Sequence, residues 1–142
     1  MTNPIIARCQ TATEAEQREV LKACFVHLFG EKPPRAHGGS LELAEWLRKH
    51  NPFYCKLDAS AYVDAALLIM REVLPGWRRV AREESDHFFV RIHSPDFDSV
   101  TWGKGENWIT DVLTGREASA KASTEALAIL SAILTAKENE NG

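Results

Sequence analysis

The sequence has no apolar run that approaches the roughly 18 residues needed to cross a membrane. Its first ten residues hold only a short apolar stretch, Pro4 to Ala7, with no basic residue before it. A secretory leader needs a positively charged start and a longer apolar region, so none is predicted. We therefore expect a protein of the cytoplasm without a membrane partner.

Cysteines are few, and none of Cys9, Cys24 and Cys55 stands at C-x-x-C spacing. This excludes a zinc ribbon and a thioredoxin-like motif. The five histidines are scattered as well, and no short segment offers the three or four ligands of a zinc site. We predict three free thiols, no bound metal and no cofactor.

An excess of basic charge is also absent, because 17 Lys and Arg stand against 20 Asp and Glu, a net charge of −3. Proteins that bind phosphate backbones are usually basic, so nucleic acid is not an expected partner. A small acidic domain suits a protein partner, whose identity the sequence does not give. The 142 residues are enough for a single domain with its own core.

What the sequence does contain is helical periodicity broken by Gly and Pro. Four helices are predicted, from Thr11 or Thr13 to Gly30, from Ser40 to His50, from Asp58 or Ser60 to Leu74, and from Ser119 or Ser123 to Lys137. The His50-Asn51-Pro52 run is expected to end the second of them. Residues 138–142 are polar and are expected to be a frayed tail.

Between the third and fourth helices the pattern changes to strands. Trp77–Glu83 and His87–His93 flank a polar turn and predict a hairpin. In the second of these strands Phe88, Val90 and Ile92 alternate with more polar positions, so we expect them to be buried against the third and fourth helices. Trp108–Leu113 is predicted as a third strand.

The resulting order α-α-α-β-β-β-α, with short turns between strands, predicts an α+β fold. We expect an antiparallel sheet of three or four strands flanked by helices, in an α/β/α sandwich-like arrangement. Residues 1–51 would form an N-terminal helical pair that packs on an α-β-β-β-α unit at 52–137. Both parts belong to one domain.

Residues 52–136 contain the motifs Pro52-Phe53-Tyr54, Asp64-Ala65-Ala66-Leu67, Pro75-Gly76-Trp77 and Thr124-Glu125-Ala126-Leu127-Ala128. On these motifs the segment resembles the phage ABA sandwich domain family. It covers about 85 of the 142 residues and leaves the first two helices unexplained. The resemblance implies an antiparallel sheet with flanking helices in a phage or prophage protein, and it implies no activity.

Two groups of residues are candidates for a binding surface. Arg78, Arg79, Arg82 and Arg91 gather on the predicted hairpin, where they would attract an acidic partner or protect a strand edge from aggregation. Trp102, Lys104 and Trp108 surround a glycine turn, where they would form either a contact platform or a lid over the core.

The sequence leaves three classes of function open. We favour a phage- or prophage-type accessory protein that acts by protein binding and has no catalytic residues. A small hydrolase is the second class, using Cys24 with His27 or His93 with Asp96. A structural homo-oligomer is the third. A pocket that collects either pair would favour the enzyme, and a shallow molecule with an exposed patch would favour the binding protein.

Overall fold

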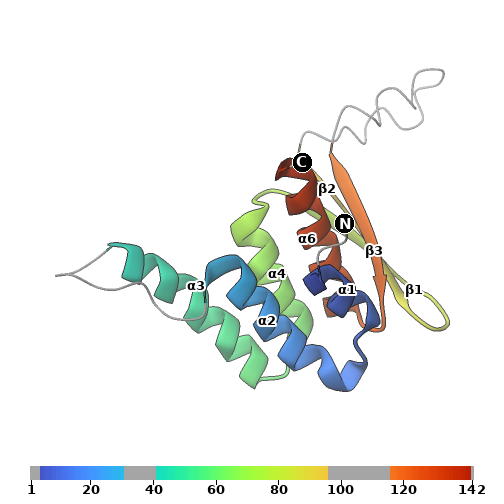
Figure 1. Cartoon of the computed structure of the whole chain (residues 1–142), viewed down its shortest axis with the longest axis horizontal. Helices are drawn as coiled ribbons and strands as arrows, with labels where there is room; N and C mark the ends of the chain where they lie inside the picture. The colour runs from blue at the N-terminus through green and yellow to red at the C-terminus, as the bar shows by residue number, and fades with distance from the viewer. Residues whose placement is uncertain (1–3, 31–40, 96–115, 142) are drawn as a thin grey trace.

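The computed structural model of the chain describes residues 4–30, 41–95 and 116–141. Its helices are α1 (Pro4–Thr11), the 3-10 turn η1 (Glu14–Glu16), α2 (Gln17–Phe29), α3 (Leu41–Asp58), α4 (Tyr62–Val73) and α6 (Glu125–Asn141). Its strands are β1 (Arg78–Glu83), β2 (Phe88–His93) and β3 (Glu117–Ala122), which form an antiparallel sheet in the order β1-β2-β3 (Figure 1). The predicted α+β class is therefore confirmed.

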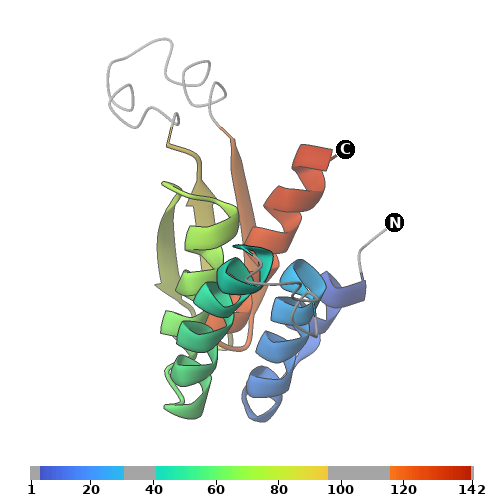
Figure 2. The ribbon, with the colours of Figure 1, turned by 90° about the vertical axis from the view of Figure 1, so that its left-hand side faces the viewer.

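The described elements are stacked in layers over one hydrophobic core. Helix α6 lies across the sheet against β2 and β3, and α1 packs beside it. Helices α4 and α2 cover the side of α6 away from the sheet, and α3 packs on α4 (Figures 1 and 2). All described helices thus lie on one face of the sheet, whereas a sandwich would place another layer on the opposite face. No described helix is long and apolar enough to span a membrane.

Helix α6 occupies the centre of this arrangement because it is apolar on every side. Leu127, Ile129, Leu130 and Ile133 point in different directions around it, and all four are fully buried. A helix of this composition needs neighbours on all sides. The sheet, α1, α2 and α4 supply them.

The predicted hairpin is confirmed, with Val90 and Ile92 fully buried and Phe88 half-buried. The helix that covers this strand is α6, the predicted fourth helix, while α4 packs on α6. Strand pairing sets Arg79 opposite Ile92 and Arg91 opposite Val80. These two arginines therefore do not face each other. Like charges directly opposite on neighbouring strands would destabilise the sheet.

The predicted end of the second helix at His50 is wrong, because α3 continues through Pro52 to Asp58. A proline inside a helix costs about 3 kcal/mol. Beyond it α3 buries Phe53 and Leu57 almost completely, and each such burial contributes about 1.5–3 kcal/mol. Tertiary packing thus outweighs the cost of the proline. The expected boundary between the N-terminal helical pair (1–51) and the α-β-β-β-α unit (52–137) therefore falls inside α3.

The segment predicted to begin the fourth helix at Ser119 is instead strand β3. Its sequence, EASAKA, is rich in the best helix former, alanine, but it also alternates with period two. Ala118, Ala120 and Ala122 are buried against α6, and the residues between them are exposed. Pairing with β2 decides in favour of the strand. The predicted strand Trp108–Leu113 lies outside the described residues.

Both chain ends contain more helix than the pattern predicted. The first ten residues include α1, which buries Ile6 and Cys9 in the core and begins at Pro4, a residue favoured in the first turn. At the other end α6 extends to Asn141, so residues 138–141 are helical rather than a frayed tail.

Candidate binding surface

The sheet face turned away from α6 is covered by no described helix. It carries the alternate residues of the three strands, namely Arg78, Val80, Arg82, Phe89, Arg91, His93, Glu117, Ser119 and Lys121. We term these nine residues the outer sheet face. Four of them are Lys or Arg and one is acidic, so this face is basic although the whole chain has a net charge of −3. Val80 is 51% exposed at its edge.

An arginine and an aromatic ring are already arranged together on this face. The guanidinium carbon of Arg82 lies 5.2 Å from the centre of the Phe89 ring, within the range of a cation–π contact. Arg82 also donates through Nε to the Glu84 carboxylate, yet its side chain stays 67% exposed. This contact orients Arg82 along the face and leaves it accessible to a partner.

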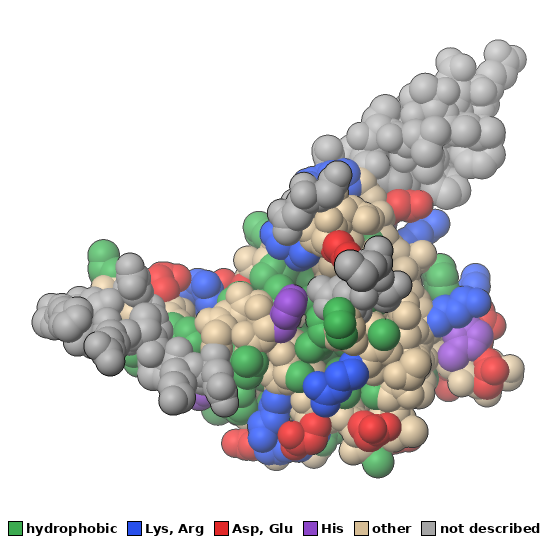
Figure 3. All heavy atoms as spheres, in the orientation of Figure 1, with side chains coloured by type: hydrophobic (Ala, Val, Ile, Leu, Met, Phe, Trp, Pro, Cys, Tyr) green, Lys and Arg blue, Asp and Glu red, His purple; other side chains and the backbone are tan. Residues whose placement is uncertain are grey.

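A second charged pair lies at the turn of the hairpin. His87 Nδ1 and Asp86 Oδ1 are 2.6 Å apart, and this hydrogen bond lowers the pKa of the Asp86 carboxyl below its ordinary value. Figure 3 shows basic, histidine and acidic side chains together at the right-hand margin of the molecule, over this hairpin. At the turn of the hairpin the outer sheet face therefore borders a region of mixed charge.

The structure brings together three of the four arginines singled out in the sequence. Arg79 is the exception, because it belongs to the opposite face, where its Nη1 lies 3.8 Å from Glu125 on α6. Lys121 and Phe89 complete the surface and were not among the candidates. Lys121 falls inside the fourth helix only if that helix begins at Ser119, one of its two predicted starts. The period-two alternation of β3 separates Lys121 from the buried alanines, and pairing with β2 sets it opposite Phe89.

The second predicted group, Trp102, Lys104 and Trp108, lies outside the described residues, as does Asp96 of the His93–Asp96 pair. Their proposed roles remain predictions. His93 itself is half-buried on β2.

The Cys24–His27 pair does not have the geometry of a nucleophile and its base. Cys24 is fully buried, and its Sγ lies 3.5 Å from that of Cys9 on α1. The hydrogen bond with Cys9 and burial both raise the pKa of the Cys24 thiol, so the reactive thiolate is disfavoured. His27, in contrast, is exposed on α2.

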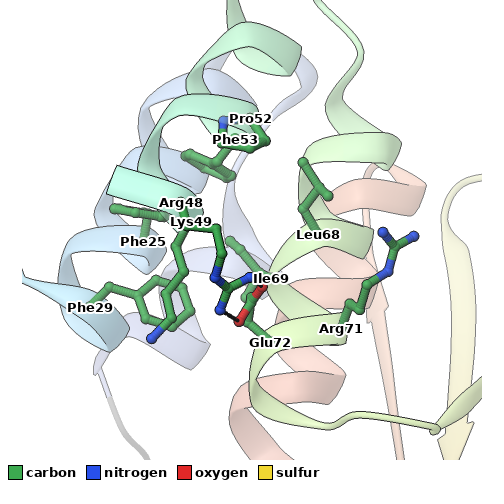
Figure 4. Close-up of a pocket in the computed structure, with 10 residues that line it drawn as sticks. All are labelled: Phe25, Phe29, Arg48, Lys49, Pro52, Phe53, Leu68, Ile69, Arg71 and Glu72. Carbon is green, nitrogen blue, oxygen red and sulfur yellow. Dashed lines mark hydrogen bonds and ion pairs between the residues drawn. The ribbon is translucent and has the colours of Figure 1, made fainter. Parts of the chain in front are cut away.

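A hollow of about 350 Å³ lies between α2, α3 and α4 (Figure 4). Its apolar lining includes Phe25, Phe53 and Ile69, and Arg48 reaches across it to Glu72. The lining contains no Cys or His, so none of Cys24, His27 and His93 borders this hollow. Within the described parts of the chain, no group of three His, Cys, Asp or Glu side chains could hold a metal ion.

Comparison of the chain with protein-family models, with curated proteins and with solved structures finds no match.

Proposed function

We propose that this protein is a phage- or prophage-type accessory protein that acts by binding, without catalysis, to an acidic segment of a partner protein on the outer sheet face. The observation that carries the proposal is the concentration of Arg78, Arg82, Arg91 and Lys121 on a face that no described helix covers. The resemblance to the phage ABA sandwich family supports the phage setting.

Charge complementarity is the reason for an acidic partner. A basic patch on an acidic protein attracts the opposite charge and suppresses binding of basic surfaces. The half-buried Phe89 on the central strand and the exposed Val80 on the edge strand add apolar area to this patch. Single-stranded nucleic acid is the rival, since a sheet with an aromatic residue and cations suits stacked bases. One aromatic side chain and a net acidic chain favour the protein partner.

The test compares two double variants that change the net charge equally. Arg82→Glu with Lys121→Glu reverses charge on the outer sheet face, while Lys22→Glu with Lys56→Glu does so on α2 and α3. The probe is a fluorescein-labelled peptide of alternating Glu and Val, measured by fluorescence polarisation at 0.15 M salt. We expect the first variant to bind at least about ten-fold more weakly, as loss of two charge-assisted contacts implies, and the second to bind like the wild type.

Melting temperatures establish that both variants are folded. Equal weakening by the two variants would show an unspecific charge effect and would contradict the proposal. A labelled oligothymidine that binds the wild type more tightly than the acidic peptide would assign the face to nucleic acid instead.

A further inference from the structure

Among the strands of residues 4–30, 41–95 and 116–141, β1 is an edge of the sheet and pairs on one side only, with β2. It lies at the margin of the molecule, away from the helical layers that contain α2 and α3 (Figures 1 and 2). An open edge strand offers a row of main-chain donors and acceptors to another strand. The question is which strand β1 suits.

The hairpin determines which main-chain groups of β1 point outward. Glu84 donates its N–H to the carbonyl of His87 at 2.8 Å, so these two residues form a closely hydrogen-bonded pair. Such pairs alternate with pairs that share no bond. It follows that Arg78, Val80 and Arg82 bond to β2 and that the N–H and C=O groups of the residues between them face the open edge. These residues are Arg79, Ala81 and Glu83.

The charges along this edge run from positive to negative. Arg78 and Arg79 begin the strand, and Glu83 and Glu84 follow at its end. An antiparallel copy of the same strand presents the reverse order. In the register centred on Ala81, Arg79 faces Glu83 of the copy and Arg78 faces its Glu84. Opposite charges meet at both ends, which stabilises a strand pair.

Neighbouring registers are less favourable. A slip of two residues in one direction sets Arg78 against Arg82, and a slip in the other direction sets Arg82 against its own copy. Like charges directly opposite each other destabilise a strand pair. The small Ala81 at the centre lets the two strands approach without a clash. The sequence of β1 therefore favours one register.

We propose that two copies of this chain pair through β1 in this register, about a two-fold axis at Ala81, to form a continuous six-stranded sheet. The three outward residues of each copy would form about six main-chain hydrogen bonds across the axis. The contact is isologous, so each copy uses the same surface and the assembly closes at two. The two outer sheet faces join into one larger basic surface.

An acidic strand from another protein is the rival occupant of this edge. It would meet Arg78 and Arg79 favourably but would also face Glu83 and Glu84. The second copy satisfies both ends at once, and this is the reason to prefer it. The inference concerns the edge of the sheet and does not rest on the function proposed for its face.

Sedimentation analysis from 10 µM to 1 mM gives the first test, with a particle of about twice the chain mass of 15.9 kDa expected at the higher concentrations. Glu83→Arg should abolish the dimer, because it sets two cations against each other on each side of the axis. Arg79→Glu together with Glu83→Arg reverses both members of each pair and should restore it. A matched change outside the strand, Glu138→Arg on α6, should leave it unchanged.

A backbone variant completes the test. Ala81→Pro removes an N–H that faces the open edge and leaves the bonds to β2 intact, and edge strands accept proline in such positions. We expect a folded monomer, with folding checked by circular dichroism. The proposal is overturned by a wild type that stays monomeric to 1 mM, by a dimer that survives both Glu83→Arg and Ala81→Pro, or by a charge-reversed double variant that stays monomeric while folded.

Discussion

Arg48 on α3 and Glu72 on α4 form a two-pronged ion pair. Arg48 Nη1 donates to Glu72 Oε1 at 2.8 Å and Nη2 to Oε2 at 3.1 Å. Nη2 also lies 3.0 Å from Glu45 on the same helix. The pair joins two helices across the hollow between α2, α3 and α4 (Figure 4), and parallel bonds of this kind fix geometry as well as charge.

The ion pair predicts a dependence of stability on pH. The hydrogen bond from Arg48 lowers the pKa of Glu72 below its ordinary value of 4.5, with further attraction from Lys49 and Arg71. A lowered pKa in the folded state contributes stability above the unfolded pKa, and this contribution is lost as the pH falls through the folded value. Glu72→Gln should therefore lower the free energy of unfolding at pH 7 and have a smaller effect at pH 3, as measured by urea denaturation.

The control for this prediction is Glu45→Gln, since Glu45 makes a single contact with Arg48 and its side chain is 61% exposed. We expect it to change stability less than Glu72→Gln does. An equal effect of Glu72→Gln at both pH values would show that the pair contributes through packing rather than through charge.

A matched pair of leucine substitutions tests the central position of α6. Leu127 is fully buried, whereas Leu41 at the start of α3 is 83% exposed. Leu127→Ala should lower the free energy of unfolding by about 2–5 kcal/mol, since it leaves a cavity. Leu41→Ala should change it by less than about 0.5 kcal/mol. If chemical denaturation gave similar losses of unfolding free energy for the two variants, the burial of Leu127 and the exposure of Leu41 would be contradicted.

The start of α6 depends on a hydroxyl that accepts a hydrogen bond. Thr124 Oγ1 accepts from the N–H of Leu127 at 3.2 Å, an N-cap contact. Thr124→Ala should therefore cost about 1 kcal/mol of unfolding free energy. Thr135→Ala is the control on the same helix, because its hydroxyl bonds back to the Ser131 carbonyl. Such back-bonding adds little to helix stability. If both variants lower the free energy of unfolding equally, Thr124 does not stabilise α6 as its N-cap.

The three thiols should differ in reactivity. Cys55 is exposed, while Cys9 and Cys24 are buried and adjacent. The raised pKa of Cys24 further reduces its thiolate fraction at neutral pH. N-ethylmaleimide should modify Cys55 first in the folded protein and all three residues after denaturation without reductant, as mass spectrometry would show. Recovery of a Cys9–Cys24 disulfide from unreduced protein would contradict the prediction of free thiols.

The spacing of apolar residues and the residues at turns and helix starts by themselves determined much of this fold. Thr13, one of the two predicted starts of the first helix, is the N-cap of η1, where the Glu16 carboxylate accepts from the Thr13 N–H at 2.9 Å. The hairpin from β1 to β2 also follows from the sequence, because alternating apolar residues around a polar turn leave few other conformations. Local rules suffice where each contact is made by residues close in the chain.

Local sequence patterns predicted the arginine cluster only in part. A strand's two faces are distinguished by alternation, which separates Arg79 from Arg78 and Arg82, but the register with β2 depends on hydrogen bonds between distant residues. Lys121 enters the surface only because β3 pairs with β2, and the alanines around it are equally compatible with a helix.

The tertiary structure decided the remaining features because burial outweighed local preference. The sequence alone specified the α+β order, the acidic balance of the chain and the apolar circumference of α6. Packing of Phe53 and Leu57 carried α3 past Pro52, pairing with β2 made a strand of an alanine-rich segment, and the covering of one sheet face by α6 left the basic residues on the other. Each of these outcomes depends on contacts between residues far apart in the chain, whose free energies exceed the roughly 1 kcal/mol range of local propensity.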